Sequence, residues 1–382
     1  MRFPVSFSVF ISILIFTIHC QKQVVPQEEI SKNIPSPKVY IQKEGLGKRG
    51  SFVGMEPYLN QYSYATDESF YLALNEYFQL AKENELLFVD RSIIVLPEYI
   101  GTWLVATAED KSIFQVKTIQ EAMEVLVKQN LGSFLWHYLF SNSYSSDTLK
   151  ETLFRMKAWQ MTDRYQSVFA RLAREYRVSI LAGSIVLPHP KVIEGKITPT
   201  DGPLENVSFY FHPDGRVDDK IVRKLFPIVD EKEFLSEGKL DENPSYQTTL
   251  GKLYTMVCAD SWFPEVYKEF KKSESELLAV PSFVSPADAW TTKWQGYNGY
   301  ANPKDVDSKD IGVISERTAW KKYAMNGRLK DPKVKAGINV FFRGEIWDLA
   351  ASGDAFLNLG GKPVSNVVKE EKNQGRIYVL YL

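Results

Sequence analysis

The stretch "YTMVCADSWFPE", residues 254–265, decides how the rest of this chain is interpreted. Its first half is apolar and predicts a short buried strand, and Pro264 opens a segment with helical spacing. Cys258 therefore falls in the turn between a strand and a helix, where backbone amides favour a thiolate and can hold an oxyanion. This position makes Cys258 a candidate nucleophile. A lone cysteine is also commonly a small buried apolar residue, so the position alone does not decide between the two roles.

Composition excludes several classes of protein. The chain has 382 residues, of which 44% are hydrophobic and 13% aromatic, so it can bury a core without disulfides. Its net charge is −1 and it has no long basic run, whereas nucleic-acid binding needs a clustered positive surface, so no nucleic-acid partner is expected. Two cysteines fit no metal-finger spacing and the histidines show no ligand spacing, so we expect neither a metal nor another cofactor. The histidines are His19, His137, His189 and His212.

The first twenty residues, "MRFPVSFSVFISILIFTIHC", have the pattern of an export signal. Arg2 precedes an apolar run that is short for a membrane span, and Cys20 stands where the run ends. This pattern resembles a bacterial lipoprotein signal, in which the cysteine is lipidated and becomes the mature N-terminus, although His19 departs from the usual small residue. A plain secretory signal with an incidental cysteine is the alternative. We expect an exported protein of the periplasm or cell envelope, anchored to a membrane through Cys20.

Helical and strand patterns alternate from Ser51 onward, which predicts an α/β fold. Residues 21–50 are polar and rich in Pro and Lys, and they predict a tether or irregular lead-in. The expected helices span 68–85, 162–178 and 263–273. Thr162 or Asp163 is the expected N-terminal cap of the second helix. The expected strands lie within 51–60, 91–99, 179–187, 206–217, 253–259, 276–283, 337–352 and 375–382.

Two segments, 104–150 and 286–335, lack a regular pattern. The second is rich in aromatic residues, Gly, Asn and Asp, and long loops without regular structure are often lids or binding loops. A loop over a pocket and a surface insertion without contact to the chemistry are therefore the two interpretations of 286–335.

The segment "VCADSWFPEVY" resembles the nucleophile motif of the carbon–nitrogen hydrolase (nitrilase/amidase) superfamily, which is Cys-x-Asp-x-x-Phe-Pro-Glu after a hydrophobic strand. Two further motifs of that family precede it in the expected order. "SIIVLPEY" places Glu98 after an apolar strand, and "HPDGRVDDKIVRKLFPIVDE" places Lys224 after a Pro-Asp-Gly turn, with Pro227 and Glu231 behind it. Because three motifs occur in the expected order, a nucleophilic role for Cys258 is favoured over that of a small buried apolar residue.

The resemblance implies one domain over 51–382 with an αββα sandwich, in which two mixed β-sheets face each other and helices cover the outer faces. It also implies roles for individual residues. Glu98 would be the base that takes the thiol proton, protonates the leaving amine and then activates water. Lys224 would stabilise the thiolate and, with the backbone N–H of Ala259, the oxyanion. Glu231 would orient Lys224 or share in the proton transfer.

Some of these assignments have neighbours that compete for them. Lys220 is the alternative to Lys224, and Glu233 is the alternative to Glu231, because each pair lies in a stretch of mixed charge that is typical of a solvated surface. Asp260 is expected to hold the turn rather than to act in the chemistry.

Two segments and one residue depart from the family pattern. Residues 315–329 match poorly the helix that usually follows the cysteine motif, and Phe226 stands where a histidine is common. Residues 341–353 are only loosely similar to the usual Gly-x-Ser strand. These departures leave the three catalytic candidates in place but leave the substrate open.

Three functions follow as alternatives. The first is an exported, lipid-anchored amidohydrolase that cleaves a non-peptide C–N bond of a small-molecule amide through a thioester on Cys258. The second is an acyltransferase that passes the same thioester to an amine, but the relative that acylates lipoproteins carries several membrane spans and no such run follows residue 20. The third is a catalytically inactive binding protein on the cell surface. Nitrile hydrolysis is less favoured than amide hydrolysis, and assembly into a homo-oligomer stays open.

Overall fold

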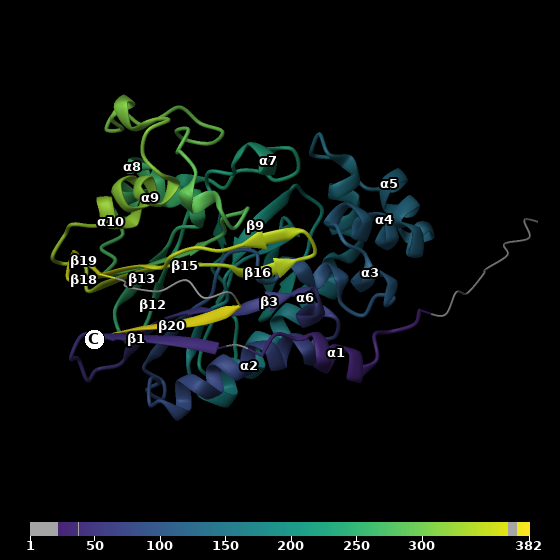
Figure 1. Cartoon of the computed structure of the whole chain (residues 1–382), viewed down its shortest axis with the longest axis horizontal. Coiled ribbons are helices and arrows are strands. Elements are labelled where there is room, and N and C mark those ends of the chain that lie inside the picture. Colours follow the sequence, from purple (N-terminus) through teal and green to yellow (C-terminus); the bar gives the residue numbers. More distant parts are fainter. Residues whose placement is uncertain (1–21, 37, 366–372) are drawn as a thin grey trace, which may run out of the picture.

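The computed structural model of the chain describes residues 22–36, 38–365 and 373–382. The export signal expected over 1–20, including Cys20, lies outside the described residues. Within them the chain has a mixed α/β fold built from several mixed sheets and the helices that cover them (Figure 1).

The first large sheet has six strands in the order β1-β20-β2-β4-β5-β10. Strands β2 and β4 pair in parallel, as do β4 and β5 and also β1 and β20, whereas β20 runs antiparallel to β2 and β10 runs antiparallel to β5. The strands are β1 (Lys38–Glu44), β2 (Ser51–Glu56), β4 (Ser92–Val95), β5 (Ser179–Leu181), β10 (Tyr210–Phe211) and β20 (Gln374–Tyr381).

The second large sheet has six strands in the order β12-β13-β14-β15-β18-β19, with a parallel centre and antiparallel edges. The strands are β12 (Ser245–Gln247), β13 (Lys252–Thr255), β14 (Leu277–Ser282), β15 (Ala336–Phe341), β18 (Phe356–Leu359) and β19 (Lys362–Val364). The strand patterns predicted from Ser51 onward are confirmed at β2, β4, β13, β14, β15 and β20.

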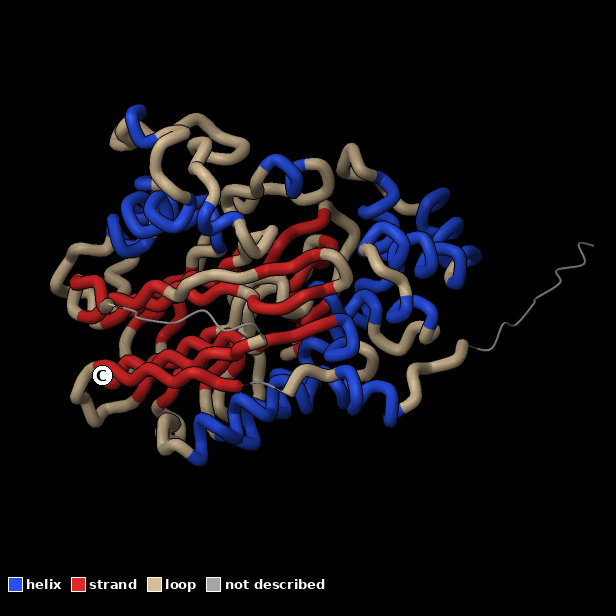
Figure 2. Tube along the Cα trace, in the orientation of Figure 1, coloured by secondary structure: helices blue, strands red, loops and turns tan. Residues whose placement is uncertain are grey.

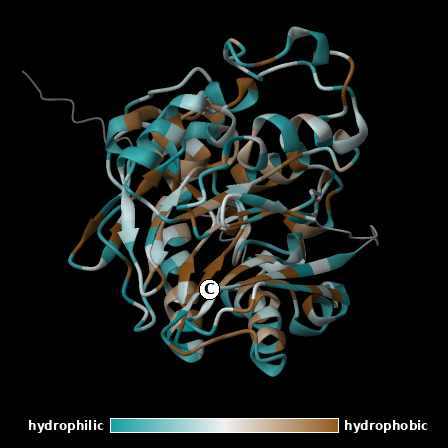
Figure 3. Ribbon diagram, turned by 90° about the vertical axis from the view of Figure 1, so that its left-hand side faces the viewer, coloured by the Kyte–Doolittle hydropathy of each residue, from teal (hydrophilic) through white to brown (hydrophobic). Residues whose placement is uncertain are grey.

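Strands β2 and β15 bring the two sheets into contact. A Cβ atom at Gly54 would lie 2.6 Å from a side-chain atom of Val340 and 2.9 Å from one of Ile338, so the absence of a side chain permits this approach. At the end of the same strand, Glu56 Oε1 accepts a 2.8 Å hydrogen bond from Phe341 N. Figure 3 shows hydrophobic segments in brown among the central strands and teal on many outward turns.

Helices lie outside the strands (Figure 2). α2 (Asp67–Glu83) and α6 (Thr148–Tyr176) lie beside the first sheet, and α8 (Pro264–Lys272), α9 (Glu316–Tyr323) and α10 (Met325–Arg328) lie beside the second (Figure 1). α2 begins with a capping box between Thr66 and Ser69 and turns its apolar face inward, as its sequence period predicts. Among the described residues, no helix has both the length and the apolar character needed to cross a bilayer.

Smaller sheets and helices surround one end of the large sheets. One small sheet is β11-β9-β6 and another is β17-β16-β3, and β7 pairs with β8. Their bounds are β3 (Tyr58–Asn60), β6 (Ile185–Pro188), β7 (Lys191–Ile193), β8 (Lys196–Thr198), β9 (Leu204–Ser208), β11 (Val222–Arg223), β16 (Arg343–Ile346) and β17 (Leu349–Ala351). The remaining helices are α1 (Gln27–Asn33), α3 (Ser112–Gln115), α4 (Ile119–Gln129), α5 (Leu131–Phe140) and α7 (Val229–Lys232).

Three sequence predictions need correction. The lead-in over 21–50 is not irregular throughout, because it contains α1 and the edge strand β1, which pairs with β20 over its whole length. β1 is mostly polar, and its partner lies at the other end of the chain, so local patterns do not indicate it. α6 begins at Thr148, with Asp147 as its cap, and not near Thr162, whose hydroxyl donates to Ala158 O within the helix. Most of 104–150 is helical.

Candidate active site

Glu98 follows β4 and is almost completely buried, with 1% of its surface exposed. Its Oε1 atom accepts two hydrogen bonds, one from Asn206 Nδ2 at 2.8 Å and one from Lys224 Nζ at 2.8 Å. Asn206 comes from β9, and Lys224 comes directly after β11, which pairs with β9. The small β11-β9-β6 sheet therefore sets the position of both donors.

Lys224 is a buried cation between two carboxylates. Besides its contact with Glu98, its Nζ atom donates to Glu231 Oε1 at 2.7 Å. Glu231 belongs to α7 and also accepts hydrogen bonds from the backbone N–H of Ile228 and from the Tyr99 hydroxyl. Nζ also lies 2.7 Å from Glu231 Oε2, so the ammonium group contacts both oxygens of that carboxylate.

The two competing charged residues lie elsewhere. Lys220 is exposed and its Nζ donates to Ser245 O at 2.8 Å. Glu233 is exposed and lies 3.7 Å from Lys150 in an ion pair. Of the charged residues in this stretch, the structure brings Lys224 and Glu231 to Glu98, and it leaves Lys220 and Glu233 at the surface.

Cys258 follows β13 and opens a 3-10 helix over Cys258–Trp262. Its φ angle is 51°, in the left-handed region that costs a non-glycine residue free energy and often marks a functional turn. Its Sγ atom lies 3.6 Å from Phe283 O. Asp260 holds the turn as the sequence predicts, because its carboxylate accepts hydrogen bonds of 2.9 Å from the backbone N–H of Val257, Leu225 and Phe226. The cysteine turn and the segment that carries Lys224 are thus tied together.

A cavity of about 820 Å³ is lined by Glu98, Lys224, Glu231, Cys258 and Ala259. Much of its remaining wall is aromatic, and part of that wall comes from the segment 286–335. In particular, Trp294 stacks on Trp262 at 5.8 Å between ring centroids, and both rings line the cavity. Part of 286–335 lines the cavity, so a surface insertion without contact to this site is wrong. The prediction of a long loop over a pocket holds only in part, because α9 and α10 lie within this segment.

Burial and neighbouring charges shift the pKa values of the central groups. Burial raises the pKa of Glu98 to about 7, against the lowering effect of the Lys224 charge. Burial acts to lower the pKa of Lys224, but the carboxylates of Glu231 and Glu98 outweigh it and hold the pKa well above its ordinary value. Lys224 therefore stays charged, while Glu98 can exchange a proton near neutral pH.

The thiol of Cys258 differs from the sequence expectation of a favoured thiolate. Burial and then the negative charge of Glu98 raise its pKa well above the ordinary value, and Lys224 only partly offsets them. The resting group is a thiol that can donate a hydrogen bond to Glu98. Proton transfer to the carboxylate, rather than a preformed thiolate, is the form of activation that this geometry permits.

Three residues of the site are missing from the sequence-based candidates: Asn206, Tyr99 and Phe283. Tyr99 directly follows Glu98, and its φ of 63° turns its hydroxyl toward Glu231. Asn206 lies in the "NVSFYF" strand that resembles an Asn-containing strand of the family, which is the one sequence signal for it. No sequence pattern indicates the contact between the Phe283 carbonyl and Cys258, because a backbone contact depends on the fold and not on the type of residue.

The described part of the chain contains no group of three or more His, Cys, Asp or Glu side chains placed to hold a metal ion. What it contains is a thiol, a carboxylate of raised pKa and a fixed ammonium group in one cavity. Such a set can form and break a covalent acyl bond to sulfur.

Comparisons with known proteins agree with this chemistry. A family model described as carbon-nitrogen hydrolase matches residues 52–297. The Bacillus subtilis (strain 168) protein named probable hydrolase YhcX is 27% identical over 122 residues, which are 32% of this chain. The match spans only 21% of that relative's length.

Solved structures show the same fold at low sequence identity. A carbon-nitrogen hydrolase from Helicobacter pylori G27 aligns with a TM-score of 0.51 and 15% identity, over 86% of this chain and 88% of that one. An amidase from Nesterenkonia sp. aligns with a TM-score of 0.51 and 13% identity, over 88% of this chain and 92% of that one. A variant of the Nesterenkonia sp. AN1 amidase, aligned with a TM-score of 0.51 and 14% identity over 89% of this chain and 93% of that one, carries the acetamide moiety of fluoroacetamide on its active-site cysteine. Since the family model covers more than half of the chain, this protein belongs to the carbon-nitrogen hydrolase family.

Proposed function

We propose that this protein is an amidohydrolase that cleaves a small-molecule amide, with Cys258 as nucleophile, Glu98 as base and Lys224 as the stabilising cation. One observation carries the proposal. The buried chain of contacts from Glu98 through Lys224 to Glu231 lines the same cavity as the Cys258 thiol.

In the first half of the reaction, Cys258 Sγ attacks the carbonyl carbon of the amide while its proton passes to Glu98. Asn206 and Lys224 occupy Oε1 of that carboxylate, so its other oxygen is the acceptor for the proton. The carbonyl oxygen gains negative charge in the tetrahedral intermediate. The positive charge of Lys224 and the backbone N–H of Ala259 stabilise that negative charge.

In the second half, the C–N bond breaks and Glu98 returns its proton to the leaving nitrogen, which departs as ammonia or an amine. A thioester on Cys258 remains. Glu98 then takes a proton from water as the water oxygen attacks the thioester carbonyl. The C–S bond breaks to release the carboxylic acid, and Glu98 returns the proton to the departing Cys258 Sγ. A base with a pKa near 7 suits both directions of this transfer at neutral pH.

Two further parts of the proposal concern the fold and the location. We assign the αββα sandwich, because the two six-stranded sheets contact each other at β2 and β15 and helices lie outside both. We also assign export and lipidation at Cys20 to a membrane of the cell envelope. This part rests on the sequence of residues 1–20.

The test is a screen of purified protein against small amides, with release of ammonia or amine as the measurement. Hydrolysis of at least one amide by the native protein, lost in Cys258→Ala, supports the proposal. An added amine acceptor separates the alternatives: capture of the acyl group by the acceptor at the expense of water indicates an acyltransferase. A protein that neither turns over any amide nor reacts with fluoroacetamide at Cys258 is a binding protein, and the proposal then fails.

A further inference from the structure

Helix α5 presents an apolar surface to solvent. The stretch 131–146, "LGSFLWHYLFSNSYSS", contains no Asp, Glu, Lys or Arg. Phe134 alone among its large apolar side chains is buried, and the others are between 45% and 68% exposed. They are Leu131, Leu135, Trp136, Tyr138, Leu139, Phe140 and Tyr144, which we call the α5 patch. A contiguous apolar surface of this kind on a folded protein usually marks a site of interaction.

The first end of α5 is fixed by a buried ion network. Asn130, which caps the helix, donates to Glu109 Oε2 at 3.0 Å and accepts a 3.1 Å hydrogen bond from Lys22 Nζ. Glu109 is buried and also pairs with Lys22 at 2.7 Å and with the buried Lys157. The position of α5 is therefore set by the core of the protein.

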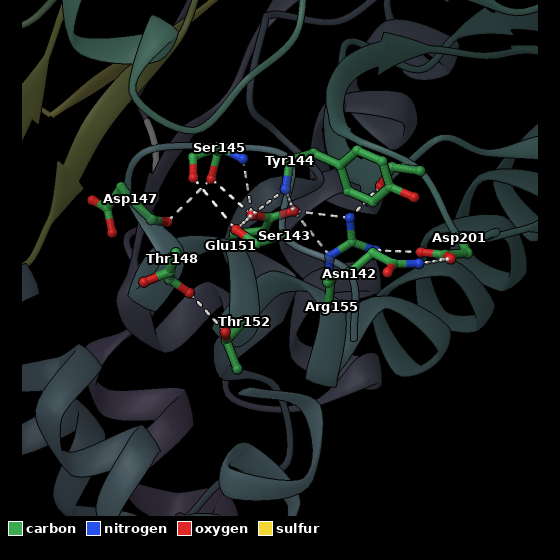
Figure 4. A network of polar contacts seen from close by, with 11 residues as sticks. Asn142, Ser143, Tyr144, Ser145, Asp147, Thr148, Glu151, Thr152, Arg155 and Asp201 are labelled. Carbon is green, nitrogen blue, oxygen red and sulfur yellow. Dashed lines mark hydrogen bonds and ion pairs between the residues drawn. The ribbon is translucent and has the colours of Figure 1, made fainter. Parts of the chain in front are cut away.

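The second end is fixed by the network in Figure 4. The buried carboxylate of Glu151 accepts hydrogen bonds from the backbone N–H of Tyr144 at 3.1 Å and of Ser145 at 3.2 Å, and from the Ser143 hydroxyl at 3.1 Å. Arg155 donates to the same carboxylate at 2.9 Å. Since both ends are held by buried polar groups, the apolar side chains are held outward by the fold.

The end of the described chain indicates what covers this surface. Lys22, the first described residue, contacts Asn130 at the start of α5, so Lys22 lies beside the patch. Cys20 is two residues before it, and an apolar run precedes Cys20 in the sequence. Any attachment of this N-terminal segment to a bilayer brings α5 to the same surface.

The composition of the patch also fits a bilayer. Trp and Tyr are enriched at the membrane interface, because their rings are apolar and their N–H or O–H groups meet water, and Leu and Phe enter the acyl region. A ten-residue helix is too short to span a bilayer but can lie in the interface. A single lipid chain gives only weak attachment, and a second membrane contact makes it stable.

We propose that the α5 patch docks onto the interface of a phospholipid bilayer as a second membrane contact beside the N-terminus. This contact goes beyond the proposed hydrolase activity and does not depend on that activity, but the choice of a bilayer as partner rests on the proposed membrane attachment of the N-terminus. It predicts membrane binding by protein that carries no lipid on Cys20.

The experiment uses the full chain as Cys20→Ser, mixed with vesicles of phosphatidylcholine and phosphatidylglycerol, some with brominated acyl chains. We expect vesicle binding with quenching of tryptophan fluorescence by the brominated chains, and loss of most of the quenching in Trp136→Phe. The variant Trp136→Ser/Leu139→Ser/Phe140→Ser should bind vesicles at least about tenfold more weakly than the Cys20→Ser parent. Its thermal unfolding midpoint should be unchanged, because these side chains are exposed.

The matched control replaces three exposed apolar residues outside α5: Leu46→Ser/Val89→Ser/Val313→Ser. It should bind vesicles as the parent does. Equal vesicle binding by both triple variants would overturn the proposal, and so would binding without quenching of Trp136 fluorescence. In either case the apolar N-terminal run would be the sole membrane contact or would itself cover α5. Sedimentation of the parent as a dimer that the α5 variant alone dissociates would overturn it in favour of a second copy.

Discussion

Lys224 Nζ lies 2.8 Å from Glu98 Oε1, although 126 residues separate the two along the chain. Both groups are almost completely buried, and a buried ion pair stabilises a protein only when its remaining hydrogen-bonding capacity is used. Here Asn206 donates a hydrogen bond to Glu98, and Glu231 accepts one from Lys224, so part of that hydrogen-bonding capacity is used. Lys224 also lines the cavity that holds Cys258, which is where a reaction would use its positive charge.

Replacing Lys224 by alanine should abolish amide hydrolysis and destabilise the fold. The change leaves two carboxylates buried without a cation, which costs roughly 3–5 kcal/mol of unfolding free energy. Chemical denaturation and the rate of ammonia release measure the two effects. Lys220→Ala is the matched control, because Lys220 is exposed, and it should leave both nearly unchanged. Equal effects of the two substitutions would remove Lys224 from the site.

Glu98→Gln should retain the fold and lose most of the activity. The glutamine oxygen can still accept from Asn206 and Lys224, but it cannot take the thiol proton, so kcat/KM should fall by about 10²–10⁴-fold. The control is Glu233→Gln, which alters an exposed carboxylate outside the cavity. Activity within about twofold of the native rate in Glu98→Gln would show that another group is the base.

Activity should fall as the pH is lowered through about 7. In the proposed mechanism Glu98 can act as the base only when it is ionised, and burial raises its pKa to about 7. Below that pH, kcat/KM should decrease by about tenfold for each pH unit, because the ionised fraction does so. A profile measured with a substrate that does not itself titrate tests this. A flat profile between about pH 5 and pH 8 would be incompatible with Glu98 as the base.

Asn206→Ala should move this acidic limb to higher pH. The amide donates a hydrogen bond to the ionised form of Glu98, so its loss raises the pKa of the carboxyl further, by about half a unit to one unit. The shift of the pH profile distinguishes a positioning effect from a general loss of stability. Asn243→Ala removes an amide that bonds to Thr255 O instead, and it should leave the limb in place.

Local patterns in the sequence were sufficient for much of the fold. The apolar runs before Glu98 and Cys258 are strands of the two large sheets, because buried strands need short apolar segments whatever the topology. Edge strand β1 was missed because its side chains are mostly polar and its partner β20 is distant in sequence. The first half of α6 was missed because an internal threonine resembled a cap.

For the candidate site, sequence motifs indicate which residues take part, but the contacts between them depend on the fold. The motifs are sufficient to indicate Glu98 and Cys258 and to favour Lys224, but Lys220 fits the same motif order. The structure separates the two lysines, because Lys224 bonds to Glu98 and Lys220 bonds to Ser245 O. The contacts of Tyr99 and Asn206 were not, because they depend on backbone angles and on the packing of a small three-stranded sheet. The direction of the Cys258 pKa shift was also not predictable, because burial, which outweighs the nearby cation, is a property of the folded protein.

The nucleophilic role of Cys258 is tested most directly by the reaction of fluoroacetamide with the native protein, followed by mass spectrometry of its peptides. We expect an acetamide moiety to become bonded to Cys258 Sγ as fluoride leaves. We also expect this thiol to react much faster in the folded protein than in the unfolded chain, because the cavity orients the reagent and Glu98 takes the proton. If Cys258 of the folded protein stays unmodified, or reacts no faster than in the unfolded chain, Cys258 is not the proposed nucleophile.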